Sequence, residues 1–153
     1  MTEEFRCYTF THFMLSSIQQ GIQSGHAAME LVNKYYDPDD RFWYGESLWD
    51  DIVDWIRDNK TIVCLNGGNT ESMVELESFL NTYANPFPWV SFHEDESSME
   101  GILTSIAIII PDRIYDAEVE EQYWGGMASQ IPGEFTEWEW ELYHRIKSAP
   151  LAR

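Results

Sequence analysis

Basic residues are scarce in this chain, and their scarcity sets the strongest limit on what the protein can bind. Its 153 residues include 9 Lys and Arg against 27 Asp and Glu, which gives a formal net charge of −18. Proteins that bind nucleic acids gain much of their affinity from Lys and Arg side chains that neutralise several phosphates. The sequence therefore disfavours tight binding to a long nucleic acid. We interpret the excess of carboxylates as a solubilising surface, with mimicry of a nucleic acid as the alternative.

Cysteines and long apolar runs are also rare. Cys7 and Cys64 lie in short apolar stretches typical of buried strands, and we expect two reduced core thiols, with a disulfide between neighbouring strands as the open alternative. The chain has no CxxC motif and no Cys/His ligand spacing, so it predicts no metal site and no cofactor. The longest apolar run, Ile106–Ile110, is too short to span a bilayer, and the acidic N-terminus is unlike a signal peptide. We expect a soluble, cytoplasmic protein without membrane contact.

The spacing of apolar residues predicts an alternation of strands and helices. Strands are expected over 5–13, 61–65, 89–92 and 103–110. Helices are expected from Ser16 or Ser17 to about Lys34, over 46–58, from Asn69 or Thr70 to about Tyr83, near 117–124 and over 134–147. The order β-α-α-β-α-β-β predicts an α/β domain over 1–111 with a partly parallel sheet, and a helical extension over 112–153 packed on the same domain.

The first predicted helix has two different faces, because a helix turns by about 100° per residue. We expect the small and apolar face to pack on the sheet; it comprises Gly21, Ile22, Gly25, Ala28, Met29 and Val32. The polar row consists of Gln19, Gln23, His26 and Glu30. Ligands of open α/β sheets bind beyond the carboxyl ends of strands, where helix N-termini offer free N–H groups. The row is therefore expected to line a cleft, with simple exposure to water as the alternative.

Further candidates follow the strands. His93, Glu94 and Asp95 come directly after the third strand and would supply a histidine base beside carboxylates, unless they form an acidic solvated loop. His12 ends the first strand close to the first helix. Thr104 lies inside the last strand, either as a hydrogen-bonding side chain for a ligand or simply as a good strand former.

Two segments of the chain resemble a known protein family. The stretch SSIQQGIQSGHAAMEL (16–31) is similar to the first-helix signature of the type 2 peptidyl-tRNA hydrolases, with the Gln-x-x-His-Ala core at Gln23, His26 and Ala27. It resembles more closely a divergent branch that reads GQQAVQAGHA in the same place. The stretch VSFHEDESSMEGILTSIAI (90–108) is similar to that branch's segment F-R-E-P…G-x-L-T-A-L-A, with matches at Phe92, Glu94, Gly101, Leu103 and Thr104. The resemblance covers Phe5–Pro111 and not the helical extension.

The resemblance implies a three-layer sandwich with a mixed four-stranded sheet, a homodimer, and hydrolysis of the ester next to the terminal nucleotide of a tRNA. The lysine that these hydrolases carry near the start of the first helix is replaced by Gln19, and a neutral amide cannot stabilise a developing oxyanion as an ammonium does. The family's Asp-Ala-Gly-x-Thr loop is replaced by His-Glu-Asp-Glu at 93–96, and the basic surface that meets tRNA is missing.

Three functions remain open at this stage. The first is a hydrolase acting on an ester next to a nucleotide. The second is a protein similar to phage-encoded ones, acting in the host cytoplasm, that binds or cleaves a small nucleotide signal of cyclic or ADP-ribose type in the same pocket. The third is an acidic protein–protein interaction module that uses the aromatic residues Trp124, Trp138, Trp140 and Tyr143.

The candidate residues are the same for the first two functions. The catalytic candidates are His26, His93 and Asp95. The ligand-binding candidates are His12, Ser17, Gln19, Gln20, Gln23, Glu30, Glu94 and Thr104. The expected partner is a small nucleotide or a nucleotide-terminated substrate.

Overall fold

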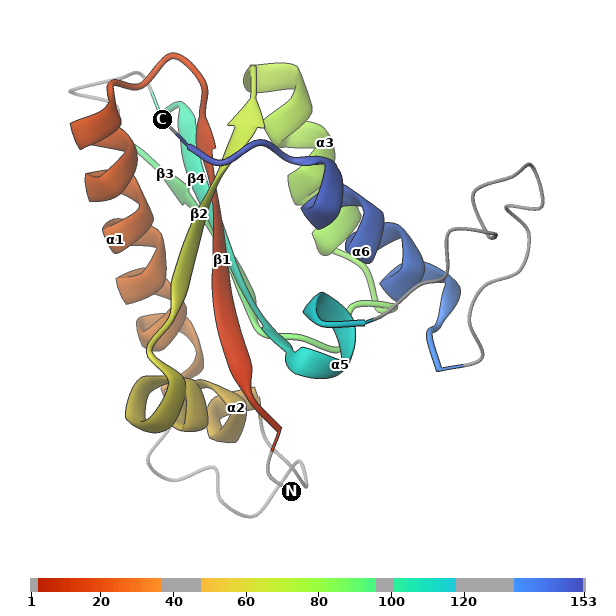
Figure 1. The fold of residues 1–153 in the computed structure, drawn as a ribbon. Helices are drawn as coiled ribbons and strands as arrows, with labels where there is room; N and C mark the ends of the chain where they lie inside the picture. The colour runs from red at the N-terminus through yellow and green to blue at the C-terminus, as the bar shows by residue number, and fades with distance from the viewer. Residues whose placement is uncertain (1–2, 37–47, 96–100, 118–133, 153) are drawn as a thin grey trace, which may run out of the picture.

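A computed structural model describes residues 3–36, 48–95, 101–117 and 134–152 (Figure 1). Its strands are β1 (Phe5–His12), β2 (Ile62–Gly68), β3 (Trp89–His93) and β4 (Leu103–Pro111). Its helices are α1 (Ser17–Tyr35), α2 (Leu48–Asp54) with the π-helical turn η1 (Trp55–Asn59), α3 (Thr70–Leu80), α5 (Asp112–Tyr115) and α6 (Glu137–Ser148). The helix predicted near 117–124 lies mostly outside the described residues, and so does the start of the one predicted over 46–58.

The strands form one mixed sheet in the order β2-β1-β4-β3. β1 and β2 are parallel, while β4 runs antiparallel to both of its neighbours, β1 and β3. The parallel pair requires a crossover, which the chain makes through α1 and α2. The predicted α/β class, the mixed four-stranded sheet and the order of its elements are thereby confirmed.

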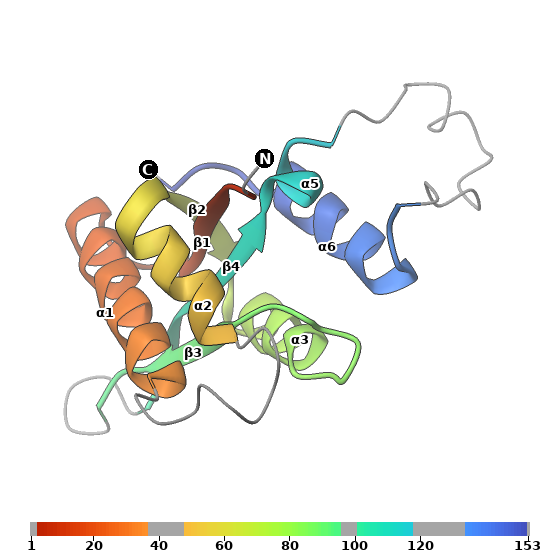
Figure 2. The same cartoon turned by 90° about the horizontal axis from the view of Figure 1, so that it is seen from below.

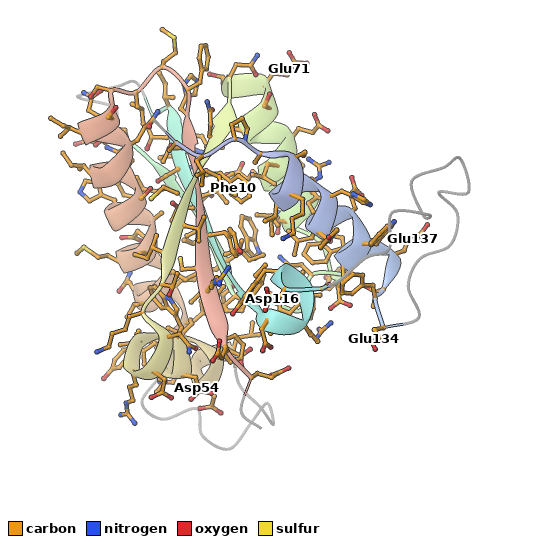
Figure 3. All side chains as sticks on the ribbon, in the orientation of Figure 1. Phe10, Asp54, Glu71, Asp116, Glu134 and Glu137 are labelled. Atoms are coloured by element: carbon orange, nitrogen blue, oxygen red, sulfur yellow. The ribbon has the colours of Figure 1, made fainter. Side chains whose placement is uncertain are left out.

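Helices cover both faces of the sheet. α1 and α2 lie on one face, and α3 and α6 lie on the other (Figures 1 and 2). Side chains of β1 alternate between the two layers: Cys7 packs with Ala27 and Leu31 of α1, whereas Phe10 belongs to the larger core beneath α3 and α6. Figure 3 shows the outcome, with Phe10 enclosed and acidic side chains such as Glu71 and Asp54 at the outer edges.

The packing face of α1 differs from the one that the sequence predicts. Ile22 and Met29 are 50% and 70% exposed, so the face expected to pack on the sheet points largely outward. The buried face carries Gln20, Gln23, Ser24, Ala27 and Leu31. Polar side chains can be buried here because the sheet offers hydroxyl groups to them, as described below. The prediction of an apolar inner face was wrong for the first half of the helix.

The ends of the helices follow the sequence signals closely. Ser16 caps α1 through a reciprocal pair of hydrogen bonds with Gln19, which is one of the two pairs that the sequence allows. Asn69 caps α3, its side chain accepting from the Ser72 N–H at 2.9 Å. The preceding Gly68 has φ of +85°, a left-handed conformation that glycine adopts without strain.

The end of the described chain returns to the sheet. α6 packs into the larger core through Trp138, Leu142 and Ile146. The segment after it lies antiparallel to β2, bridging Leu151 to Leu65. Its backbone is held by the Asn66 N–H donating to the Pro150 carbonyl at 2.8 Å and by a second bond from 152 to 64. Part of the outer edge of β2 is therefore already paired.

Both cysteines are free, as expected. Burial raises the pKa of the Cys7 thiol to about 12, so this thiol stays protonated at neutral pH. Within the described ranges, no helix is long and apolar enough to cross a membrane.

Candidate functional site

Gln23 connects α1 to β4 and to the residue that follows β3. Its side-chain oxygen accepts a hydrogen bond from the Thr104 hydroxyl at 2.8 Å, and its side-chain nitrogen donates to Glu94 Oε2 at 2.7 Å. Thr104 is fully buried, and Gln23 is 6% exposed. The amide is therefore fixed at both ends in a water-poor environment, and it holds the Glu94 carboxylate in one orientation.

A β-bulge directs Thr104 toward α1. Phe92 pairs with Ser105 while the next residue, His93, pairs with Leu103, so Thr104 has no partner across β3. Such a bulge re-aims a side chain, and bulges are frequent next to active sites. Its result here is that two consecutive residues face the same helix: Ser105 donates to the Gln23 carbonyl at 2.8 Å, and Thr104 donates to the Gln23 side chain.

A second polar pair closes the same interface. Thr9 of β1 and Ser24 of α1 share a hydrogen bond of 2.8 Å between their hydroxyl groups, and both are buried. Together with Gln23, these groups form a polar strip where a helix normally packs through apolar side chains alone. Because the strip is internally bonded, it fixes how α1 lies on the sheet.

The Glu94 carboxylate is the part of the network that solvent can reach. Its second oxygen, Oε1, accepts from the backbone N–H of Asp95 at 3.3 Å. Both of its oxygens thus have a donor, and the carboxylate is held in one orientation. A carboxylate held in place can accept a proton from water, as a general base does.

His26 lies one helical turn beyond Gln23. Its ring packs on Phe92 of β3, with ring centroids 5.0 Å apart. Its Nδ1 atom is buried and has no hydrogen-bond partner among the described residues. The structure thus places His26 beside β3, the strand that precedes Glu94, with one ring nitrogen that has no hydrogen-bond partner.

His12, a ligand-binding candidate from the sequence, uses both of its ring nitrogens for hydrogen bonds within the protein. Its Nδ1 accepts from the Met14 N–H at 3.2 Å, so the proton of the neutral ring lies on Nε2, which is 2.9 Å from the Thr70 hydroxyl. Burial lowers the pKa of this imidazole, which keeps it neutral. Nδ1 thus fixes the turn after β1 and Nε2 joins the end of β1 to the start of α3, so His12 positions its neighbours.

The remaining candidate residues on α1 differ in how far their side chains are exposed to solvent. Ser17, Gln19 and Glu30 are exposed, and Gln19 is engaged in the cap of the helix, its Oε1 accepting from the Ser16 N–H at 3.2 Å. Gln20 is buried, and its side-chain nitrogen donates to the Leu15 carbonyl at 3.2 Å. The predicted polar row therefore does not act as one unit, since Gln23 enters the packed interface and Gln19 and Glu30 do not.

His93 does not face the first-helix site. Side chains of β3 alternate between the faces of the sheet, and His93 lies on the α3 side with its Nε2 3.8 Å from Glu77. The structure therefore separates His93 from Glu94, which the sequence places together. Asp95 is exposed, and its backbone N–H is its link to the network.

A separate hollow of about 380 Å³ lies at the carboxyl ends of β1 and β2. It is lined by Phe13, Leu15, Gln20, Asn66, Pro150 and Leu151. Of these, only Gln20 is among the residues that the sequence proposes for a ligand. The spacing of Gln20, Gln23, Ser24 and Ala27, which marks one face of a helix, is the signal that could have identified this side of α1.

The described residues contain no group of three His, Cys, Asp or Glu side chains that could hold a metal ion. Two of the aromatic residues proposed for a protein partner, Trp138 and Tyr143, are buried in the larger core and do not form an exposed surface. The Trp138 ring N–H donates to the Phe79 carbonyl at 3.0 Å. Trp124 lies outside the described residues.

The expected homodimer and nucleotide partner stay predictions. No family model matches this chain, and no curated protein matches it.

Proposed function

We propose that this protein is a divergent hydrolase with the fold of the type 2 peptidyl-tRNA hydrolases, acting on an ester next to a nucleotide. The observation that carries the proposal is the hydrogen-bonded network of Gln23, Thr104 and Glu94. Gln23 comes from the first segment that resembles the family, and the other two come from the second. The two stretches of sequence that resemble the family thus meet in one buried contact beside the Glu94 carboxylate.

In this proposal Glu94 acts as the general base. It takes a proton from a water molecule, the resulting hydroxide adds to the ester carbonyl, and the tetrahedral intermediate expels the ribose oxygen. The proton returns to that oxygen from Glu94 or arrives from His26, so the products are a carboxylic acid and a free hydroxyl. Gln23 and Thr104 are positioning residues, because they hold Glu94 and are too buried to touch the substrate.

The charge of the chain favours a small or short substrate. At a net charge of −18, a tRNA body is repelled, whereas a single terminal nucleotide needs only a local site. The same observation favours the second candidate function, in which the site binds or cleaves a free nucleotide of cyclic or ADP-ribose type. Stabilisation of the protein by such a nucleotide in a thermal-shift panel, without any ester cleavage, would favour this candidate over the first.

The test of the hydrolase proposal is release of the acyl group from two substrates, peptidyl-tRNA and a 3′-acylated adenosine. The Glu94→Gln variant keeps the size of the side chain and removes the base, so we expect kcat to fall by about 10²–10⁴-fold. Glu71→Gln is the matched control, because Glu71 is an exposed carboxylate on α3, which covers the other face of the sheet. Release at background level from both substrates by the unmodified protein would overturn the proposal.

A further inference from the structure

The hollow at the carboxyl ends of β1 and β2 has the size of a ligand site. Its volume of about 380 Å³ falls within the range of about 300–1,000 Å³ found for small-molecule pockets. Its lining is apolar on several sides, through Phe13, Leu15, Pro150 and Leu151. The described residues that line it carry no charge, so the hollow suits an uncharged group.

Two amide side chains in the lining each have one end fixed. The Gln20 nitrogen donates to the Leu15 carbonyl, which leaves the Gln20 oxygen as an acceptor without a donor among the described residues. The Asn66 oxygen accepts from the Gly68 N–H at 2.9 Å, which leaves the Asn66 nitrogen as a donor. The hollow therefore presents one acceptor and one donor whose amide planes are already held in place.

Phe13 adds an aromatic surface with a firm support. Its ring is 49% exposed and stacks on the His12 ring, with centroids 5.3 Å apart and an angle of 21° between the planes. His12 is held at both ring nitrogens, by Met14 and by Thr70. The aromatic surface is therefore pre-organised, which lowers the entropy cost of binding a flat ligand.

We propose that this hollow holds an uncharged nucleobase. The edge of a base carries a donor beside an acceptor, which matches the Gln20 oxygen and the Asn66 nitrogen, and its flat faces stack on aromatic rings such as Phe13. Gln20 precedes Gln23 by three positions, so their Cβ atoms lie about 5–6 Å apart on one helix face. The hollow and the Gln23–Glu94 contact thus share one face of α1, and in this respect the inference rests on the proposed function.

The experiment measures binding of adenosine, guanosine, cytidine and uridine by calorimetry. Leu151→Trp fills the hollow from a side chain that is 65% exposed, and we expect it to abolish binding. Met29→Trp is the matched control, because Met29 is 70% exposed on the outer face of α1 and should leave binding unchanged. Phe13→Ala should weaken binding by about 5- to 150-fold, the loss of one base–aromatic stack.

The outcomes separate this inference from the hydrolase proposal. Nucleoside binding that is lost in Leu151→Trp supports the inference even if no ester is cleaved. Failure of all four nucleosides to bind at millimolar concentration overturns it, as does equal binding by Leu151→Trp and the unmodified protein. Comparing adenosine with a dinucleotide that ends in adenosine distinguishes a free nucleoside from a strand terminus as the source of the base.

Discussion

The hydroxyl of Thr104 should be worth a measurable part of the stability of this protein. In Thr104→Val the side chain keeps its shape but loses the donor that bonds the Gln23 oxygen at 2.8 Å. Because both residues are buried, the Gln23 oxygen would be left without a donor, a situation that costs about 1–3 kcal/mol. Domains of this size are stable by about 5–15 kcal/mol, so the change is a substantial fraction of the total.

The assay is equilibrium unfolding in urea, followed by the fluorescence of the 7 Trp residues. We expect a lower midpoint with an unchanged dependence on urea, and a melting temperature lower by about 2–12 °C. Thr82→Val is the control, because Thr82 is exposed and should change stability by no more than about 0.5 kcal/mol. Equal stability of the two variants would refute the claim that the buried network contributes to folding.

A double variant makes the test sharper. Replacing both partners, in Thr104→Val with Gln23→Leu, removes the unpaired oxygen along with its donor. The coupling between the two substitutions should therefore be about 0.5–3 kcal/mol, with the double variant less unstable than the sum of the single ones. Strict additivity would mean that the hydrogen bond seen between these side chains has no energetic weight.

Four further predictions concern charge and protonation. Burial raises the pKa of Glu139, but hydrogen bonds from Arg113 at 2.6 Å and from the Thr136 backbone bring this pKa below its usual value. Glu139→Gln should therefore lower the free energy of unfolding by about 1.5–3 kcal/mol at neutral pH. Urea titrations should show that this loss becomes smaller as pH falls below about 4.5. Burial lowers the pKa of His12, so its neutral form stabilises the fold above about pH 6.5, and this contribution is lost on acidification. The free energy of unfolding of His12→Asn should therefore decrease less between about pH 7 and 5 than that of the unmodified protein. Cys7, with its raised pKa, should react with a thiol reagent only as fast as the protein opens, and mass spectrometry should find Cys64 labelled first. If the protein cleaves peptidyl-tRNA, KM should decrease as ionic strength rises to about 0.15 M, since screening weakens the repulsion between two polyanions; an increase in KM would contradict that reasoning.

Local sequence signals account for most of the fold. The strands and the caps of α1 and α3 follow from short-range periodicity and from single residues such as Ser16 and Asn69, because these features depend on neighbours in the chain. It was harder to predict on which face of the sheet each residue lies. His93 and Glu94 were grouped as one loop, although the alternation of a strand that continues through His93 would have separated them.

The spacing of Gln20, Gln23, Ser24 and Ala27 marks one face of α1, but it does not show that this polar face packs inward. Gln23 and Ser24 are buried because Thr104, Ser105 and Thr9 supply hydroxyl partners, two of them some 80 positions away in the chain. By strict alternation with Ile106, Thr104 would lie on the opposite face of the sheet, and only the bulge brings it to α1. A single sequence gives no local sign of either the partners or the bulge.

The antiparallel segment at 150–152 has a consequence for when the protein becomes competent to bind. The hollow draws its walls from Phe13 and Gln20 and from Pro150 and Leu151, which lie at least 130 positions further along the chain. Contacts between such distant positions form slowly, because a long loop must close first. During synthesis the strands and the earlier helices can therefore assemble while the hollow still lacks one wall, and that wall is added only after Pro150 and Leu151 have left the ribosome.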